Sequence, residues 1–140
     1  MSEQDPTTAD RLAGTDLFQG LSRRHLRKVA ELARTVQHQP GREVATEGLG
    51  ALAFHLILDG QAKVTSNHKE IRTLGPGDYF GEISMIDGKP RSASVEAVEQ
   101  LTTLVVPHHE FLRLVDEEPT FAKSLLNLLC SRIRDAEARD

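Results

Sequence analysis

Turn-forming residues interrupt the middle of this chain so often that no long helix fits between them. Pro40-Gly41, Asp59-Gly60 and Gly75-Pro76-Gly77-Asp78 belong to a series of turns that recur roughly every ten to fifteen residues between positions 36 and 107. Glycine adopts positive φ and proline presets φ, so these groups end regular structure. Many short strands in one small domain predict a β-sandwich or a rolled barrel. The strand-like segments are 54–58, 62–66, 70–74, 93–98 and 102–106.

The turn at Asp59-Gly60 also predicts how two of these segments connect. It stands between 54–58 and 62–66. Asp-Gly is a favoured two-residue turn in antiparallel hairpins, because both positions accept positive φ. We therefore expect the two segments to pair with each other in one sheet.

Helical patterns flank the strand region on both sides. Ser22 is a good N-cap for a helix over 23–34, which carries an apolar stripe and a basic face. Further helices are predicted over 108–118, which ends before Pro119, and over 120–140. The last helix has two adjacent apolar stripes, wider than packing on one sheet requires. Core packing, a ligand or a partner helix could use the surplus.

The composition is that of one globular domain of a soluble, cytoplasmic protein. Its 140 residues are 39% apolar and 27% charged, and no apolar run reaches the length of a membrane span. Because the formal net charge is −4, no overall basic field would attract nucleic acid. The polar start lacks a signal-peptide pattern, so we expect residues 1–14 to be disordered and 15–140 to form the domain. Cys130, the only cysteine, fits a reducing compartment and is expected to be buried on its helix.

The stretch FGEISMIDGKPRSASV at 80–95 carries the residue types that an anionic nucleotide requires. Gly81 lets the backbone approach an anion closely, and one helical turn after it would offer free N–H groups. Arg91 can bind a phosphate bidentately, where a lysine offers only a point charge. Glu82 would repel a phosphate, but it can accept a hydrogen bond from a sugar hydroxyl. Ser92 can add a hydroxyl donor to the phosphate or the base.

This stretch resembles the phosphate-binding cassette of the cyclic nucleotide-binding domain family, most closely in cyclic nucleotide-gated channels and cyclic-AMP-dependent kinase regulators. FGEISM at 80–85 and PRSAS at 90–94 match the two blocks of that cassette at the family's spacing. LGPGDYFGE at 74–82 also fits, and the resemblance covers roughly residues 15–137. It implies a mainly β fold with flanking helices. The expected architecture is an eight-stranded β-roll, a jelly-roll-like double-stranded β-helix, with an N-terminal helix and two C-terminal helices.

The resemblance also implies a ligand, cyclic AMP or cyclic GMP, with cyclic AMP weakly favoured, and no cofactor or metal. Glu82 matches the residue that holds the ribose 2′-hydroxyl, and Arg91 matches the residue that pairs with the phosphate. Arg132 falls where several channel domains carry an arginine over the base. The expected ligand-binding residues are Gly81, Glu82, Ile83, Ser84, Arg91, Ser92 and Arg132.

Signalling is expected to run through the final helix. A helix joined at Glu118-Pro119 can pivot as a unit, whereas paired strands resist deformation. Its apolar face could meet the roll over the bound base or another copy of itself in a homodimer. No output module is visible, so we expect the signal to pass to a protein partner in trans or to a segment outside this chain. Direct nucleic-acid binding is not expected.

Three alternatives fit the sequence less well. The six histidines suggest a cupin-type metal enzyme, but they show no His-x-His pair and no nucleophile–base pair stands out, so we expect neither a metal nor catalysis. A module that keeps the fold but has lost its ligand, and acts as a scaffold, is disfavoured because Glu82 and Arg91 are both present. These two residues could instead form a surface ion pair. A truncated DNA-binding regulator is disfavoured by the acidic balance and the missing reader helix.

Overall fold

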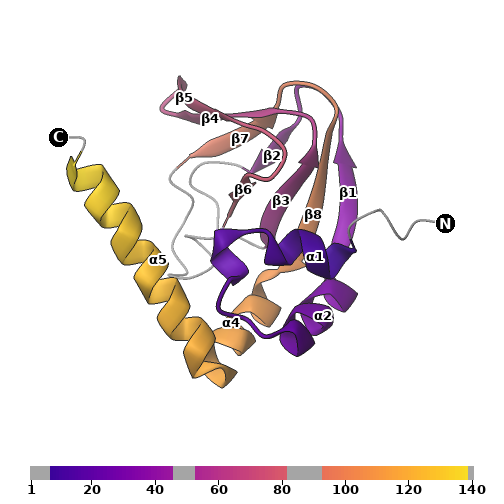
Figure 1. Cartoon of the computed structure of the whole chain (residues 1–140). Coiled ribbons are helices and arrows are strands. Elements are labelled where there is room, and N and C mark those ends of the chain that lie inside the picture. The colour runs from indigo at the N-terminus through magenta and orange to yellow at the C-terminus, as the bar shows by residue number, and fades with distance from the viewer. Residues whose placement is uncertain (1–6, 46–52, 82–92, 139–140) are drawn as a thin grey trace. The chain divides into compact units, whose positions relative to one another are not determined.

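The structure is a computed structural model that describes residues 7–45, 53–81 and 93–138 (Figure 1). These residues fall into two compact units. The strand unit runs from Leu32 to Leu112, and the helical unit combines the residues up to Glu31 with those from Arg113 onward.

The described part of the strand unit holds eight strands in two four-stranded antiparallel sheets (Figure 1). They are β1 (Arg34–His38), β2 (Glu43–Ala45), β3 (Ala53–Asp59), β4 (Ala62–Ser66), β5 (Lys69–Leu74), β6 (Tyr79–Phe80), β7 (Ser94–Ala97) and β8 (Leu101–Pro107). The first sheet has the order β1-β8-β3-β6, and the second has the order β2-β7-β4-β5. Neighbours such as β1 and β8 are far apart in the sequence, because the chain passes back and forth between the sheets. The eight-stranded β-roll that the sequence predicts is therefore confirmed.

Apolar side chains from both sheets form the interior of the roll. Along β4, buried Ala62 and Val64 alternate with the more exposed Lys63, so one face of the strand points inward. Burying a valine side chain such as that of Val64 contributes about 1.5–3 kcal/mol relative to leaving it exposed. The interior cluster consists of Ile57, Ala62, Val64, Leu74, Phe80, Val95, Ala97 and Leu101.

The hairpin predicted at Asp59-Gly60 is wrong, although the turn exists. β3 lies in the first sheet and pairs with β6 and β8, whereas β4 lies in the second sheet and pairs with β5 and β7. The turn therefore carries the chain from one sheet to the other. Gly60 has φ +89°, and a Cβ added there would lie 2.2 Å from the carbonyl oxygen of Gln100. Two-sheet packing thus requires glycine at this position for a reason unrelated to a hairpin.

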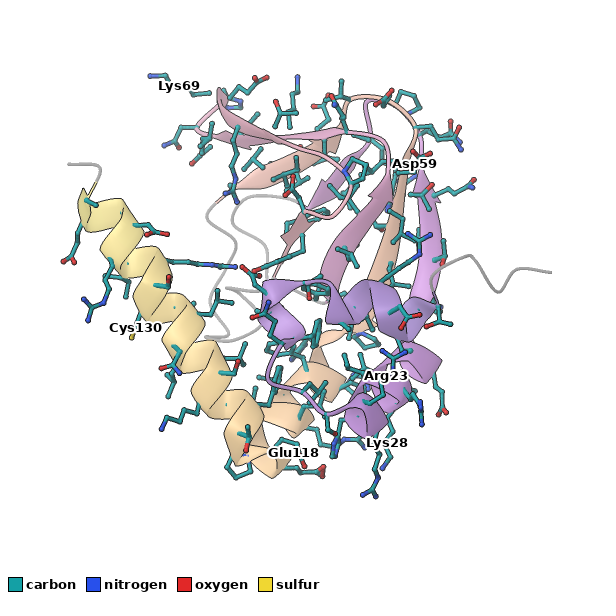
Figure 2. The ribbon with its side chains drawn as sticks, viewed as in Figure 1. Arg23, Lys28, Asp59, Lys69, Glu118 and Cys130 are labelled. Atoms are coloured by element: carbon teal, nitrogen blue, oxygen red, sulfur yellow. The ribbon has the colours of Figure 1, made fainter. Side chains whose placement is uncertain are left out.

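The β4–β5 connection is the tight hairpin that the sequence did not reveal. Asn67 and His68 both have positive φ, 53° and 64°. They lie between Ser66 and Lys69, which are directly paired. Two consecutive residues with positive φ form the mirror-image turn that matches the right-handed twist of paired strands. The tip of this hairpin, marked by Lys69, is seen in Figure 2.

The expectation of disorder through residue 14 is wrong for the described part of that segment. Helix α1 spans Thr8–Ala13, and its Leu12 is fully buried. Thr7 and Asp10 form a reciprocal capping box, in which each side chain accepts from the other residue's backbone N–H. Arg23 hydrogen-bonds the Asp10 carboxylate and, with the bond from Thr7, lowers the pKa of that carboxyl.

Helix α2 (Arg23–Leu32) confirms the predicted start of the first long helix and shortens its end. The Ser22 hydroxyl oxygen accepts a hydrogen bond from the His25 N–H at 3.3 Å, as an N-cap does. The helix ends at Leu32 because Arg34 already belongs to β1.

The two predicted C-terminal helices are confirmed as α4 (His108–Glu117) and α5 (Pro119–Ala138). The Leu114 carbonyl accepts from the Glu118 N–H, and the Glu118 carbonyl accepts from the Ala122 N–H. Glu118, labelled at the base of α5 in Figure 2, thus joins the two helices. Pro119 occupies the first position of α5, where its missing N–H costs nothing.

The base of α5 packs against the segment between α1 and α2. The rings of Phe121 and Phe18, the latter in the 3₁₀ turn η1 (Asp16–Phe18), stack with centroids 5.9 Å apart. Ser124 approaches Gly20 so closely that a Cβ on Gly20 would lie 2.3 Å from its own Cβ. His25 Nε2 lies 3.1 Å from the Glu118 carboxylate. Three neighbouring contacts therefore hold this end of the helix.

Farther along α5 the apolar face is open. Leu126 and Ile133 are 63% and 59% exposed. Cys130, labelled on α5 in Figure 2, is also exposed, so the expectation that it would be buried is wrong. The surplus apolar surface predicted for this helix is present.

Candidate ligand site

Two of the seven predicted ligand-binding residues, Gly81 and Arg132, fall within the described structure. Arg132 lies on α5 in the helical unit and is partly buried. Gly81 lies in the strand unit, directly after β6. The remaining predicted residues lie outside the described residues: Glu82, Ile83, Ser84, Arg91 and Ser92. The roles assigned to all seven remain predictions.

The backbone that leads to the cassette is tied to β3. In the turn before β6, the Asp78 carboxylate accepts from the Gly75 N–H at 2.8 Å. The Ile57 carbonyl accepts from the Gly77 N–H, and the Asp78 carbonyl accepts from the Ile57 N–H, both at 2.9 Å. The GPGD sequence therefore forms a closed turn that delivers the chain to β6 at the edge of the first sheet.

Gly81 has φ +94°, in the region that favours glycine. The chain leaves the first sheet at this residue and re-enters the second sheet at β7. A residue with a side chain would strain the backbone where the predicted cassette begins. This conformation gives a physical reason for glycine at the first position of the motif.

A buried polar row crosses the first sheet beside this exit. The Thr103 hydroxyl lies 3.0 Å from His38 Nε2 and 3.2 Å from His55 Nδ1. The His55 ring stacks on Phe80, with centroids 4.8 Å apart and planes 3° apart. All four side chains are at least nine-tenths buried. We call His38, Thr103, His55 and Phe80 the histidine row.

Burial sets the charge state at one end of the histidine row. Desolvation lowers the pKa of His38, and the nearby Arg42 guanidinium lowers it further. Both effects favour the neutral form of the His38 imidazole. The row was not predicted from the sequence, where the histidines were weighed only as metal ligands. The available signal was His55 within the strand-like segment 54–58, whereas His38 lies outside every predicted strand segment.

The described residues contain no group of three or more His, Cys, Asp and Glu side chains that could hold a metal ion. Among the helices in the same described ranges, none has the length and hydropathy needed to cross a membrane.

The model of the cyclic nucleotide-binding domain family matches residues 35–118. This range spans all the described strands except the first residue of β1, and it includes the whole predicted cassette. The chain therefore belongs to the cyclic nucleotide-binding domain family.

Curated relatives carry similar sequences. The cyclic AMP receptor protein of Thermus thermophilus is 29% identical over 90% of this chain. A cGMP-dependent protein kinase of Plasmodium berghei is 32% identical over 71%, and a cAMP-dependent protein kinase regulatory subunit of Yarrowia lipolytica is 36% identical over 63%. The match covers 61% of the first relative, 12% of the second and 24% of the third.

The fold is also found in a solved structure. The catabolite activator protein of Thermus thermophilus superposes with a TM-score of 0.75 at 28% identity, over 89% of this chain and 61% of that one. The likeness extends to residues on both sides of the strands. It supports the mainly β architecture with flanking helices.

Proposed function

We propose that this protein binds a cyclic nucleoside monophosphate, with cyclic AMP preferred over cyclic GMP, in a pocket of its β-roll. The observation that carries the proposal is the family match across residues 35–118, which contains both cassette blocks. The positive φ of Gly81, at the start of the first block, supports it. The role is binding and regulatory rather than catalytic, in the cytoplasm.

In this proposal each cassette residue meets one part of the ligand. Arg91 pairs bidentately with the phosphate, which also accepts hydrogen bonds from backbone N–H groups of Gly81, Ile83 and Ser84. Glu82 accepts from the ribose 2′-hydroxyl, and Ser92 donates to the phosphate or the base. Arg132 covers the base.

The preference for cyclic AMP is the finer part of the proposal. Two of the relatives named above have cyclic AMP in their names, and one has cyclic GMP. A hydroxyl at position 92 suits either base. Titration with both nucleotides therefore decides the preference.

We propose that α5 transmits the signal. Its base is held by Phe18, Gly20 and His25, whereas the exposed Leu126 and Ile133 leave its outer half open to a partner. That partner is a protein in trans or a second copy in a homodimer. A ligand shifts the position of α5 only if it contacts one position of the helix better than another. The alternative function is a scaffold that has lost ligand binding.

Calorimetric titration with cyclic AMP and cyclic GMP tests the function. We expect binding by the wild type, and in Arg91→Ala a loss of about 2–5 kcal/mol, roughly thirtyfold or more in affinity. Arg91→Lys should recover part of the loss, because it keeps the charge without the fork. Arg72→Ala, at an exposed arginine on β5, is the matched control and should bind normally. Equal affinity in wild type and Arg91→Ala would refute the site. Absence of binding by the wild type would favour the scaffold.

A further inference from the structure

The histidine row occupies one face of the first sheet and touches all four of its strands. His38 is paired with Leu101, two residues from Thr103 on β8. His55 on β3 is paired with Val105, two residues on the other side of Thr103, and also with Phe80 on β6. Residues two apart on a strand share a face. The row therefore runs from β1 through β8 and β3 to β6.

The face that carries the row points into the roll. Ile57, which is paired with Thr103, belongs to the interior cluster, and so do Leu101 and Phe80. A buried polar group in such surroundings is costly unless it is hydrogen-bonded. Thr103 has one hydroxyl hydrogen and two lone pairs, so it can donate to one imidazole and accept from the other. One hydroxyl thereby satisfies two buried ring nitrogens.

The far end of the row adds a side-chain contact to a very short strand at the edge of the sheet. β6 consists of only Tyr79 and Phe80 and lies at the edge of its sheet. Its pairing with β3 involves two residue pairs, Leu56 opposite Tyr79 and His55 opposite Phe80. The stack of Phe80 on His55 adds a side-chain contact at the last residue before Gly81. The bond from His55 Nδ1 to Thr103 fixes the plane of the ring against which Phe80 packs.

We infer that the histidine row is a positioning device for the ligand site: it sets the direction in which the backbone leaves β6 at Gly81. The inference rests on the proposed function, because the cassette begins at Gly81. Thr103 is its central residue and acts through His55 and Phe80 rather than by touching the ligand. Rigid placement of a binding loop raises affinity by lowering the cost of ordering it.

Two substitutions at Thr103 separate positioning from packing. Thr103→Val keeps the shape and removes the hydroxyl, whereas Thr103→Ser keeps the hydroxyl and removes a methyl group. The matched control is Thr102→Val on the same strand, with its side chain on the opposite face. Affinity for cyclic AMP and cyclic GMP is measured by calorimetry, stability by urea unfolding, and the Gly81 amide by its NMR shift and hydrogen exchange.

We expect Thr103→Val to bind about three- to tenfold more weakly, the size of one net hydrogen bond, and to shift the Gly81 amide signal. Thr103→Ser should retain wild-type affinity and the wild-type Gly81 signal even if it loses stability. If Thr103→Val leaves both the affinity and the Gly81 signal unchanged, the inference is wrong. It is also wrong if Thr103→Val and Thr103→Ser lower the affinity in proportion to their loss of stability.

The Gly81 amide also separates this inference from the proposed function. If the wild type binds neither nucleotide, the proposed function is refuted. A changed Gly81 signal in Thr103→Val would still support the inference that the histidine row positions the backbone at Gly81. His55→Phe is a second variant that keeps an aromatic ring against Phe80 and removes the bond to Thr103. It should speed exchange at Gly81, and unchanged exchange would count against the row even if Thr103→Val did not fold.

Discussion

Gly20→Ala should loosen the base of α5, because there is no room for a Cβ at this position. The added carbon would lie 2.3 Å from the Ser124 Cβ, 2.7 Å from its hydroxyl oxygen and 3.3 Å from the Thr120 carbonyl oxygen, whereas ordinary contact begins at 3.4 Å. The helix base must therefore move by about 1 Å. Overpacking of this kind costs about 1–3 kcal/mol of the free energy of unfolding.

A double-mutant cycle with Ser124→Gly isolates that overlap. Ser124→Gly alone should cost about 1 kcal/mol, the usual penalty for glycine inside a helix. It also removes the atoms that an alanine at position 20 would meet, so the double variant should lose about 1 kcal/mol and not the sum of the two single losses. Urea unfolding followed by circular dichroism measures all three variants.

The control for this cycle is Gly14→Ala. Gly14 has helical φ and ψ, and a Cβ there would lie 3.5 Å from its nearest neighbour. That change should be neutral or stabilise by about 0.4–1 kcal/mol. Additive losses in the double variant, to within about 0.5 kcal/mol, would show that Gly20 and Ser124 do not meet as described.

Two further predictions concern the strand unit. Gly60→Ala should lower the free energy of unfolding by about 3 kcal/mol or more, because overlap with the Gln100 carbonyl adds to the cost of its positive φ. The control is Gly77→Ala, where φ is +92° and the space is open, so it should lose only the conformational part, about 1–2 kcal/mol. Equal losses for the two variants in urea unfolding would contradict the overlap. The pKa of His38 is lowered in the folded state, so the unfolded state binds more protons just below pH 6.5. The contribution of His38 to the free energy of unfolding is therefore fully present above about pH 6.5. It is lost as pH falls toward the lowered pKa, by at most about 1.4 kcal/mol per pH unit. His38→Gln should flatten the urea midpoint against pH in that window, and parallel curves for the two proteins would show that another group titrates.

Residues close together in the sequence determined the helices and the turns. Pro107 and Pro119 bracket α4, and the Ser22 hydroxyl begins α2, because a proline or a cap acts on backbone groups within one turn of itself. The cassette was likewise recognised from residues 80–94 alone, since its motif is contiguous. The disorder expected at residues 1–14 failed for α1 because burial of Leu12 depends on other parts of the chain, which local polarity does not reveal.

Strand partners and close approaches were decided only by the tertiary structure. Asp59-Gly60 specifies a local bend, but whether β4 turns back beside β3 or crosses to the other sheet depends on which arrangement buries Ile57 and Val64 together. The histidine row brings residues 38, 55, 80 and 103 together through pairings far apart in the sequence. Hydrogen bonding between such residues is settled by register, and register follows from the burial of a whole strand face and not from any single residue.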